Sequence, residues 1–216
     1  MSDMNMELNE EALPKVDESD LVFNAGIAPL PEGTYAVKST LGKNGLKYDD
    51  AKKTYTIHAE NKVVKPLKIV SPFAPGVVID ESKVFFNPDG TGKGIHDFFR
   101  LSASNLPGVK KATQFLKYVG DPDYAKYKTT KQLAEAVVDA LKQEPEAKLS
   151  GRWSASVETG TDNATGRKTY ANARGQNKFP TRDDGSRNHV IELDGEYVSA
   201  RFEVVEYGEL TAKDAR

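Results

Sequence analysis

The chain has 216 residues, of which 38% are apolar, which suits one domain with a closed core and appended segments. It contains no cysteine, which excludes disulfides, thiolate catalysis and cysteine-ligated metal sites. The net charge of −2 hides segments of opposite sign, so a local site for a polyanion is not excluded.

Residues 1–28 are acidic, with Lys15 as the single basic residue, and they show no sustained hydrophobic period. This composition predicts a flexible N-terminal arm. The arm lacks the pattern of a secretory signal, and no apolar run of the chain approaches the roughly 20 residues of a spanning helix. We therefore expect a soluble, cytoplasmic protein with an arm at 1–28, one domain at 29–208 and a short tail at 209–216.

The folded part is expected to begin with strands. Residues 34–41 alternate apolar and polar side chains, which predicts a first strand, and residues 42–53 read as a long loop rich in glycine and lysine. Residues 54–59 and 63–70 are predicted to form the next strands. A third unit is expected around 77–86, with 97–101 extending it.

Two helices are expected next. Pro107 suits the first turn of a helix whose apolar face ends before Gly120. Thr129 and Gln132 have the spacing of a capping box, and the apolar residues that follow repeat every four positions until Pro145.

Residues 148–180 are predicted to form a two-stranded ribbon. In its first strand Trp153 shares an apolar face with its alternate neighbours, and Arg152 lies on the opposite, polar face. In the second strand Thr169, Ala171 and Ala173 alternate with an outward row of Tyr170, Asn172 and Arg174.

Residues 188–206 are predicted to form a hairpin with its turn at Asp194-Gly195, a strong hairpin signal. In this hairpin Ile191 and Leu193 would face an apolar row in the returning strand. That row consists of Val198, Ala200, Phe202 and Val204.

The order of these elements predicts a mainly β fold with a helical insertion. It matches an OB-fold-like Greek-key barrel with two helices between strands three and four and an extra C-terminal hairpin. In that fold the long loops and one strand face bind oligonucleotides, so residues 42–53 would form the first binding loop and residues 158–168 the second.

Four short motifs resemble bacteriophage-encoded OB-type single-stranded DNA-binding proteins. They are residues 30–35 (LPEGTY), 115–120 (FLKYVG), 149–153 (LSGRW) and 179–180 (FP), and the resemblance covers roughly residues 30–182. It implies sequence-independent binding of single-stranded DNA in the host cytoplasm, in support of DNA replication or recombination. Partners among replication or recombination proteins, and a homo-oligomer, would be consistent with it.

The expected DNA-binding residues are basic or can stack on bases, and they fall on the first strand, its loop and the ribbon. They are Lys38, Lys43, Lys47, Tyr48, Lys52, Lys53, Arg152, Arg167, Lys168, Tyr170, Asn172 and Arg174. Each has a plainer interpretation, since lysine-rich loops are often only solvated, and Tyr48 can pin its loop to the domain. Trp153 is interpreted as a core residue because its parity matches Ala155.

No enzymatic motif is complete, so we expect neither catalysis nor a cofactor. The glycine-rich segment at 90–94 lacks the Gly-Lys-Ser/Thr ending of a phosphate loop and is interpreted as a turn. His58, His96 and His189 lack metal-ligand spacing. The alternative function is a β-rich virion assembly or protein-interaction module whose exposed strands dock another subunit.

Overall fold

The computed structural model describes residues 30–70, 84–175 and 190–214. The leader, most of the expected unit at 77–86, the Phe179-Pro180 motif and His189 lie outside these ranges. Residues 84 and 85 of that unit are helical, so the expected strand is wrong at these positions. The described strands are β1 (Glu32–Asp49), β2 (Thr54–Val70), β3 (Gly94–Leu101), β4 (Glu146–Thr161), β5 (Lys168–Ala173), β6 (Val190–Leu193), β7 (Glu196–Ser199) and β8 (Arg201–Gly208). The described helices are α3 (Leu106–Tyr118) and α4 (Thr130–Lys142).

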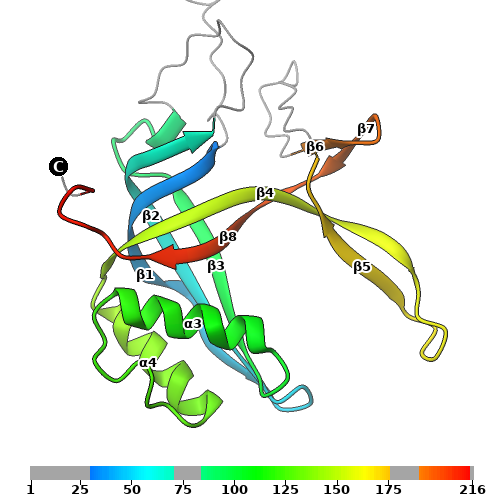
Figure 1. Cartoon of the computed structure of the whole chain (residues 1–216), viewed down its shortest axis with the longest axis horizontal. Helices are drawn as coiled ribbons and strands as arrows, with labels where there is room; N and C mark the ends of the chain where they lie inside the picture. Colours follow the sequence, from blue (N-terminus) through cyan, green and yellow to red (C-terminus); the bar gives the residue numbers. More distant parts are fainter. Residues whose placement is uncertain (1–29, 71–83, 176–189, 215–216) are drawn as a thin grey trace, which may run out of the picture.

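The main sheet is antiparallel and has the strand order β3-β2-β1-β4-β5, with β8 also paired to β4 (Figure 1). The long strand β4 pairs first with β1 and then, further along, with β5. Both helices lie between β3 and β4 in the chain, as expected. Helix α3 contacts β3 and β8, and α4 contacts β1 and β2.

The first hairpin differs from the expectation, because most of residues 42–53 continue the strands. β1 runs to Asp49, which pairs with Thr54 at the start of β2, so the loop is a short turn at 50–53. β2 is likewise one strand where two pieces were expected. A register shift lies between Leu41 and Leu46, where Gly45 adopts a φ of +53°. Cross-strand pairing has overridden the local preference of a glycine- and lysine-rich segment for a loop.

The helix boundaries confirm the expected signals. The Thr129 hydroxyl accepts a hydrogen bond from the Gln132 backbone N–H at 3.2 Å, and the Gln132 amide accepts one from the Thr129 N–H at 3.3 Å. After α3, Gly120 takes a φ of +88°, a left-handed conformation that glycine adopts without strain. Both helices bury apolar faces in a core whose largest side chains include Tyr35, Phe99, Phe115, Leu116 and Leu141.

The predicted ribbon exists, and the inward side of β4 is confirmed where the ribbon joins the domain. The opposite, polar side is covered there as well, since Ser154 is buried and Arg152 is half-buried. Trp153 is 3% exposed, and Ala155 is buried with it. Beyond this point the ribbon leaves the body of the protein (Figure 1), and both faces of β5 are exposed except at Ala173. The expectation that one row of β5 side chains faces inward was therefore wrong, because no core extends beneath the outer ribbon.

The C-terminal hairpin is confirmed only in its first part. β6 and β7 pair across Asp194-Gly195, whose φ values of +50° and +85° suit a tight hairpin turn. Phe202 and Val204 do not pair with β6, contrary to the expectation, although Phe202 packs in the same apolar cluster as Ile191. Phe202 and Val204 belong to β8, which pairs with β4 and packs its apolar row against Trp153 and the main core.

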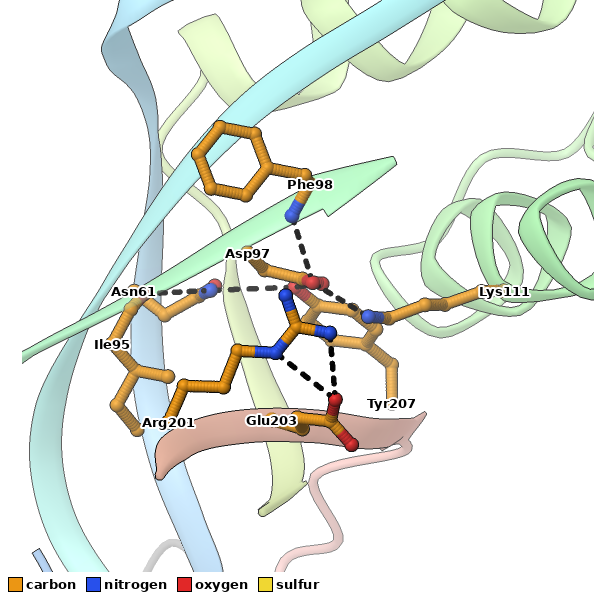
Figure 2. Close-up of polar contacts among 8 residues, drawn as sticks. All are labelled: Asn61, Ile95, Asp97, Phe98, Lys111, Arg201, Glu203 and Tyr207. Atoms are coloured by element: carbon orange, nitrogen blue, oxygen red, sulfur yellow. Dashed lines mark hydrogen bonds and ion pairs between the residues drawn. The ribbon is translucent and has the colours of Figure 1, made fainter. Parts of the chain in front are cut away.

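No ladder joins β3 to β8 in the described part of the chain, so the sheet stays open along this seam. Side chains bridge it instead (Figure 2). The Tyr207 hydroxyl on β8 donates to Asp97 Oδ2 on β3 at 3.0 Å, and Lys111 on α3 donates to Asp97 Oδ1 at 2.6 Å. Asn61 donates to the Tyr207 hydroxyl and to the Ile95 carbonyl. A buried polar network thus fixes the seam.

Candidate nucleic-acid interface

The outer face of β2 and β3 presents aromatic and cationic side chains. β3 alternates strictly, with Ile95, Asp97, Phe99 and Leu101 buried and Gly94, His96, Phe98 and Arg100 exposed. The register places His58 of β2 opposite Phe98, and Thr56 opposite Arg100. Lys47 of β1 pairs with Thr56, so it lies on the same face.

The Phe98 ring lies flat over His58 and leaves a large part of its surface exposed. The ring centroids are 4.7 Å apart with an interplanar angle of 11°, and Phe98 is 41% exposed. Gly42 makes room for the imidazole, since a Cβ at this position would lie 2.3 Å from His58 Nδ1. The Phe98 ring is therefore supported by the His58 ring and remains exposed. We call this exposed ring the aromatic platform.

A groove of about 600 Å³ runs from this platform along the end of the β1–β2 hairpin. Its lining includes Lys47, Lys52, Thr56, His58, Phe98 and Arg100. The Arg100 side chain forms no salt bridge with any described residue. Lys52 lies 3.4 Å from the Asp49 carboxylate, whose pKa is lowered chiefly by the Lys52 backbone N–H. We name this hollow the hairpin groove.

A second groove of about 870 Å³ lies between β3 and β8, on the other side of Phe98. Its lining includes Lys93, His96, Phe98, Lys111, Asn172 and Arg201. Asn172 belongs to the β4–β5 ribbon, so this hollow connects the platform with the ribbon. We name it the seam groove.

The first turn of α3 adds positive potential where the grooves meet. Asn105 lines both grooves, and its side chain accepts from the Gly108 N–H at the helix start. The same amide donates to the Arg100 carbonyl at 2.6 Å. Gly108 permits this contact, because a Cβ there would lie 2.0 Å from that carbonyl oxygen. Helix N-termini favour anions.

The structure separates the predicted residues of the first hairpin. Lys47 and Lys52 reach the hairpin groove, whereas Lys38 pairs with Glu144 at 2.6 Å and lines neither groove. Lys53 pairs with Asp50. Lys43 is exposed at the register shift of β1 and also lines neither groove.

Tyr48 lies on the other face of the hairpin from Lys47. It pairs with Tyr55, and their ring centroids are 4.5 Å apart. Tyr55 packs against the core, so the structure favours the plainer interpretation in which Tyr48 pins the hairpin end. Tyr48 therefore does not belong to the surface around Phe98.

The predicted binding residues of the β4–β5 ribbon also differ in their surroundings. Asn172 lines the seam groove, and Tyr170 is 60% exposed on the same face of β5. Arg174 binds Glu32 at 2.6 Å, and Lys168 binds Glu158 at 2.7 Å, so carboxylates of this chain already neutralise both. Arg167 is exposed in the ribbon turn, and Arg152 is half-buried opposite Glu203.

The candidate binding residues predicted from the sequence did not include Phe98, Arg100, His58 and His96. One signal was present, because 94–101 alternates apolar and polar residues once Phe98 is placed in the polar row. The adjacent Phe98 and Phe99 obscure this alternation. The meeting of the two histidines follows from the register of β2 and β3, which their spacing in the sequence does not reveal.

Three other features bear on function. The glycine-rich segment at 90–94 was expected to be a turn; the turn ends at Gly90, which has a φ of +79°, while Gly92 forms a bridge with Phe86 and Gly94 begins β3. Within the described ranges, no cluster of three or more metal-ligating side chains could hold an ion. Neither described helix has the length and apolar character needed to cross a membrane.

Comparisons with protein-family models, with curated proteins and with solved structures give no match for this chain.

Proposed function

We propose that this protein binds single-stranded DNA without sequence preference, in support of DNA replication or recombination. The observation that carries the proposal is the exposed Phe98 ring, set on His58 and flanked by Arg100 and Lys47. An aromatic face stacks on any base, and neighbouring cations attract the phosphates, so this combination suits a single strand of any sequence.

The strand order supports an open OB-type barrel as the architecture. β1, β2 and β3 form a meander, helices follow β3, and β4 returns beside β1. In OB-folds the ligand lies on the face of strands two and three, between the loop that joins strands one and two and the loop that joins strands four and five. Here Phe98 lies on that face. The β1–β2 hairpin end lies on one side and the β4–β5 ribbon on the other.

The network at the β3–β8 seam fits the same architecture. In the proposed barrel, β8 takes the position of the closing strand beside β3. Asp97, Tyr207 and Asn61 hold the two strands together without ladder hydrogen bonds. The platform on β3 is thereby fixed relative to the ribbon that β4 carries.

A protein-docking module is the alternative function, and the exposed faces of β5 are the observation that favours it. A two-stranded ribbon without a covering layer is marginally stable in water, so a partner surface would stabilise it. Such a module would not need an aromatic platform among cations. Binding to oligo-dT therefore separates the two functions.

Phe98→Ala is expected to weaken oligo-dT binding by about 1–3 kcal/mol, since stacking on one ring contributes roughly that much. Fluorescence anisotropy with a labelled oligo-dT measures the loss. Tyr48→Ala is the matched control, because Tyr48 is 47% exposed on the opposite face of the neighbouring hairpin. It should leave the affinity nearly unchanged. Equal losses in the two variants would contradict the placement of the site.

A further inference from the structure

A hydrogen-bonded chain crosses the ridge between the two grooves beneath Phe98. The backbone N–H of Asn44 lies 3.4 Å from His58 Nδ1, on the side of the hairpin groove. His58 Nε2 lies 3.0 Å from His96 Nδ1, and His96 is exposed and lines the seam groove. The chain thus links β1, β2 and β3.

The donors in this chain fix the protons on both rings. A backbone N–H can only donate, so His58 Nδ1 accepts and the His58 proton is on Nε2. His58 Nε2 then donates to His96 Nδ1, which places the His96 proton on Nε2. His96 therefore offers an N–H donor from a neutral ring.

In this arrangement the two imidazoles have no free lone pair. A further proton must break the bond from Asn44 or the bond between the rings. Burial lowers the pKa of His58, and the neighbouring His96 ring lowers it further. Glu60 and Asp97 act in the opposite direction, although Asp97 lies on the other face of β3 and is bound to Lys111 and Tyr207.

The remaining charged groups around the pair are mainly cations. They are Lys47, Lys62 and the Lys52–Asp49 pair of the β1–β2 hairpin, Arg100 of β3, Lys93, Lys111 of α3, and Arg201 with Glu203 of β8. Arg201 is held by Glu203 at 2.9 Å, and Lys111 by Asp97 (Figure 2). An excess of cations opposes protonation in the free protein, and a bound phosphate would reverse that balance.

We propose that the His58–His96 pair couples proton uptake to the binding of a phosphate group of the nucleic acid in the seam groove. This inference rests on the proposed function. The phosphate accepts a hydrogen bond from His96 Nε2, and the pair takes up a proton from solvent as its inner hydrogen bond opens. Since the complex holds more protons than the free components, binding tightens as the pH falls and weakens as the pH rises.

The test measures oligo-dT affinity between about pH 5.5 and 8, where histidine changes charge and ordinary carboxylates stay ionised. The wild-type affinity should rise about threefold to tenfold on acidification at fixed ionic strength, because the pair gains a cation. Titration calorimetry in two buffers of different ionisation enthalpy should show proton uptake. His96→Gln keeps an N–H donor that does not titrate, and it should flatten the pH profile and abolish the buffer dependence.

Arg100→Gln is the matched control, because it removes a cation beside the same platform without touching the pair. It should lower the affinity at every pH and keep a pH-dependent affinity, with the midpoint moved to higher pH because one cation that opposes protonation of the pair is gone. Wild-type affinity that does not vary with pH, or a His96→Gln profile as steep as the wild type, would overturn the inference and leave the proposed function standing. Absence of wild-type binding at every pH would overturn the proposed function, and this inference with it.

Discussion

Asp97→Ala is expected to lower the free energy of unfolding by about 3 kcal/mol or more, because it leaves a charge and a hydroxyl without their partner. Asp97 is 6% exposed and accepts from Lys111 at 2.6 Å and from Tyr207 at 3.0 Å. The Lys111 side chain is only 19% exposed, so water would solvate its charge poorly once the Asp97 carboxylate is removed. Urea unfolding followed by circular dichroism measures the change.

Asp97→Asn is the matched control for this substitution. The amide oxygen can still accept from Lys111 in the place of Oδ1, and the amide NH2 group in the place of Oδ2 can donate to the Tyr207 hydroxyl, while the opposite charge is lost. Its cost should therefore fall between those of the wild type and Asp97→Ala. If Asp97→Ala unfolded at the wild-type urea concentration, the seam network would contribute nothing to stability.

Trp153→Ala is expected to destabilise the fold by about 3–5 kcal/mol, since it empties a large core volume. The indole Nε1–H donates to the Leu30 carbonyl at 2.9 Å, and the ring meets Phe202 edge-on at 5.4 Å. The substitution thus loosens β8 and the start of β1 together.

Tyr170→Ala, on the outer part of the same ribbon, serves as its control. It should change stability by less than about 0.5 kcal/mol, because Tyr170 is exposed. Thermal unfolding of the two variants beside the wild type makes the comparison. Similar losses in both would show that the outer ribbon is packed, against the exposure of β5.

The sequence predicts the elements of this fold best where the signals are local. Thr129 with Gln132, and Gly120, mark their helix ends through contacts within a few residues. The side of β4 that carries Trp153 also follows from simple alternation. Local physics is sufficient for these features, because each depends on neighbours in the chain.

The features that were missed depend on pairing between distant segments. Residues 42–49 resemble a loop, yet pairing with β2 makes them strand. Phe202 follows a hairpin in sequence, but it pairs with Trp153 of β4 across a long connection. Alternation alone does not say which strand a segment joins.

The residues of the candidate site likewise include some that the sequence predicts and some that depend on strand pairing. Lys47, Lys52 and Asn172 were predicted from charge and position, and the structure places them in the two grooves. The exposed Phe98 ring was not predicted, since its position depends on its contact with His58 on the neighbouring strand. Which aromatic ring stays exposed depends on the register, and the register is a property of the assembled sheet.

Salt dependence of oligo-dT binding tests the central claim most directly, because each displaced counterion contributes to the slope. Wild-type protein should bind at about 50 mM salt and lose affinity steeply by about 200 mM, and duplex DNA should bind more weakly. Arg100→Gln should reduce the slope of log affinity against log salt by about 0.7, the value for one contact to a single-stranded phosphate. No binding at low salt, or an unchanged slope in Arg100→Gln, would contradict a nucleic-acid interface around Phe98.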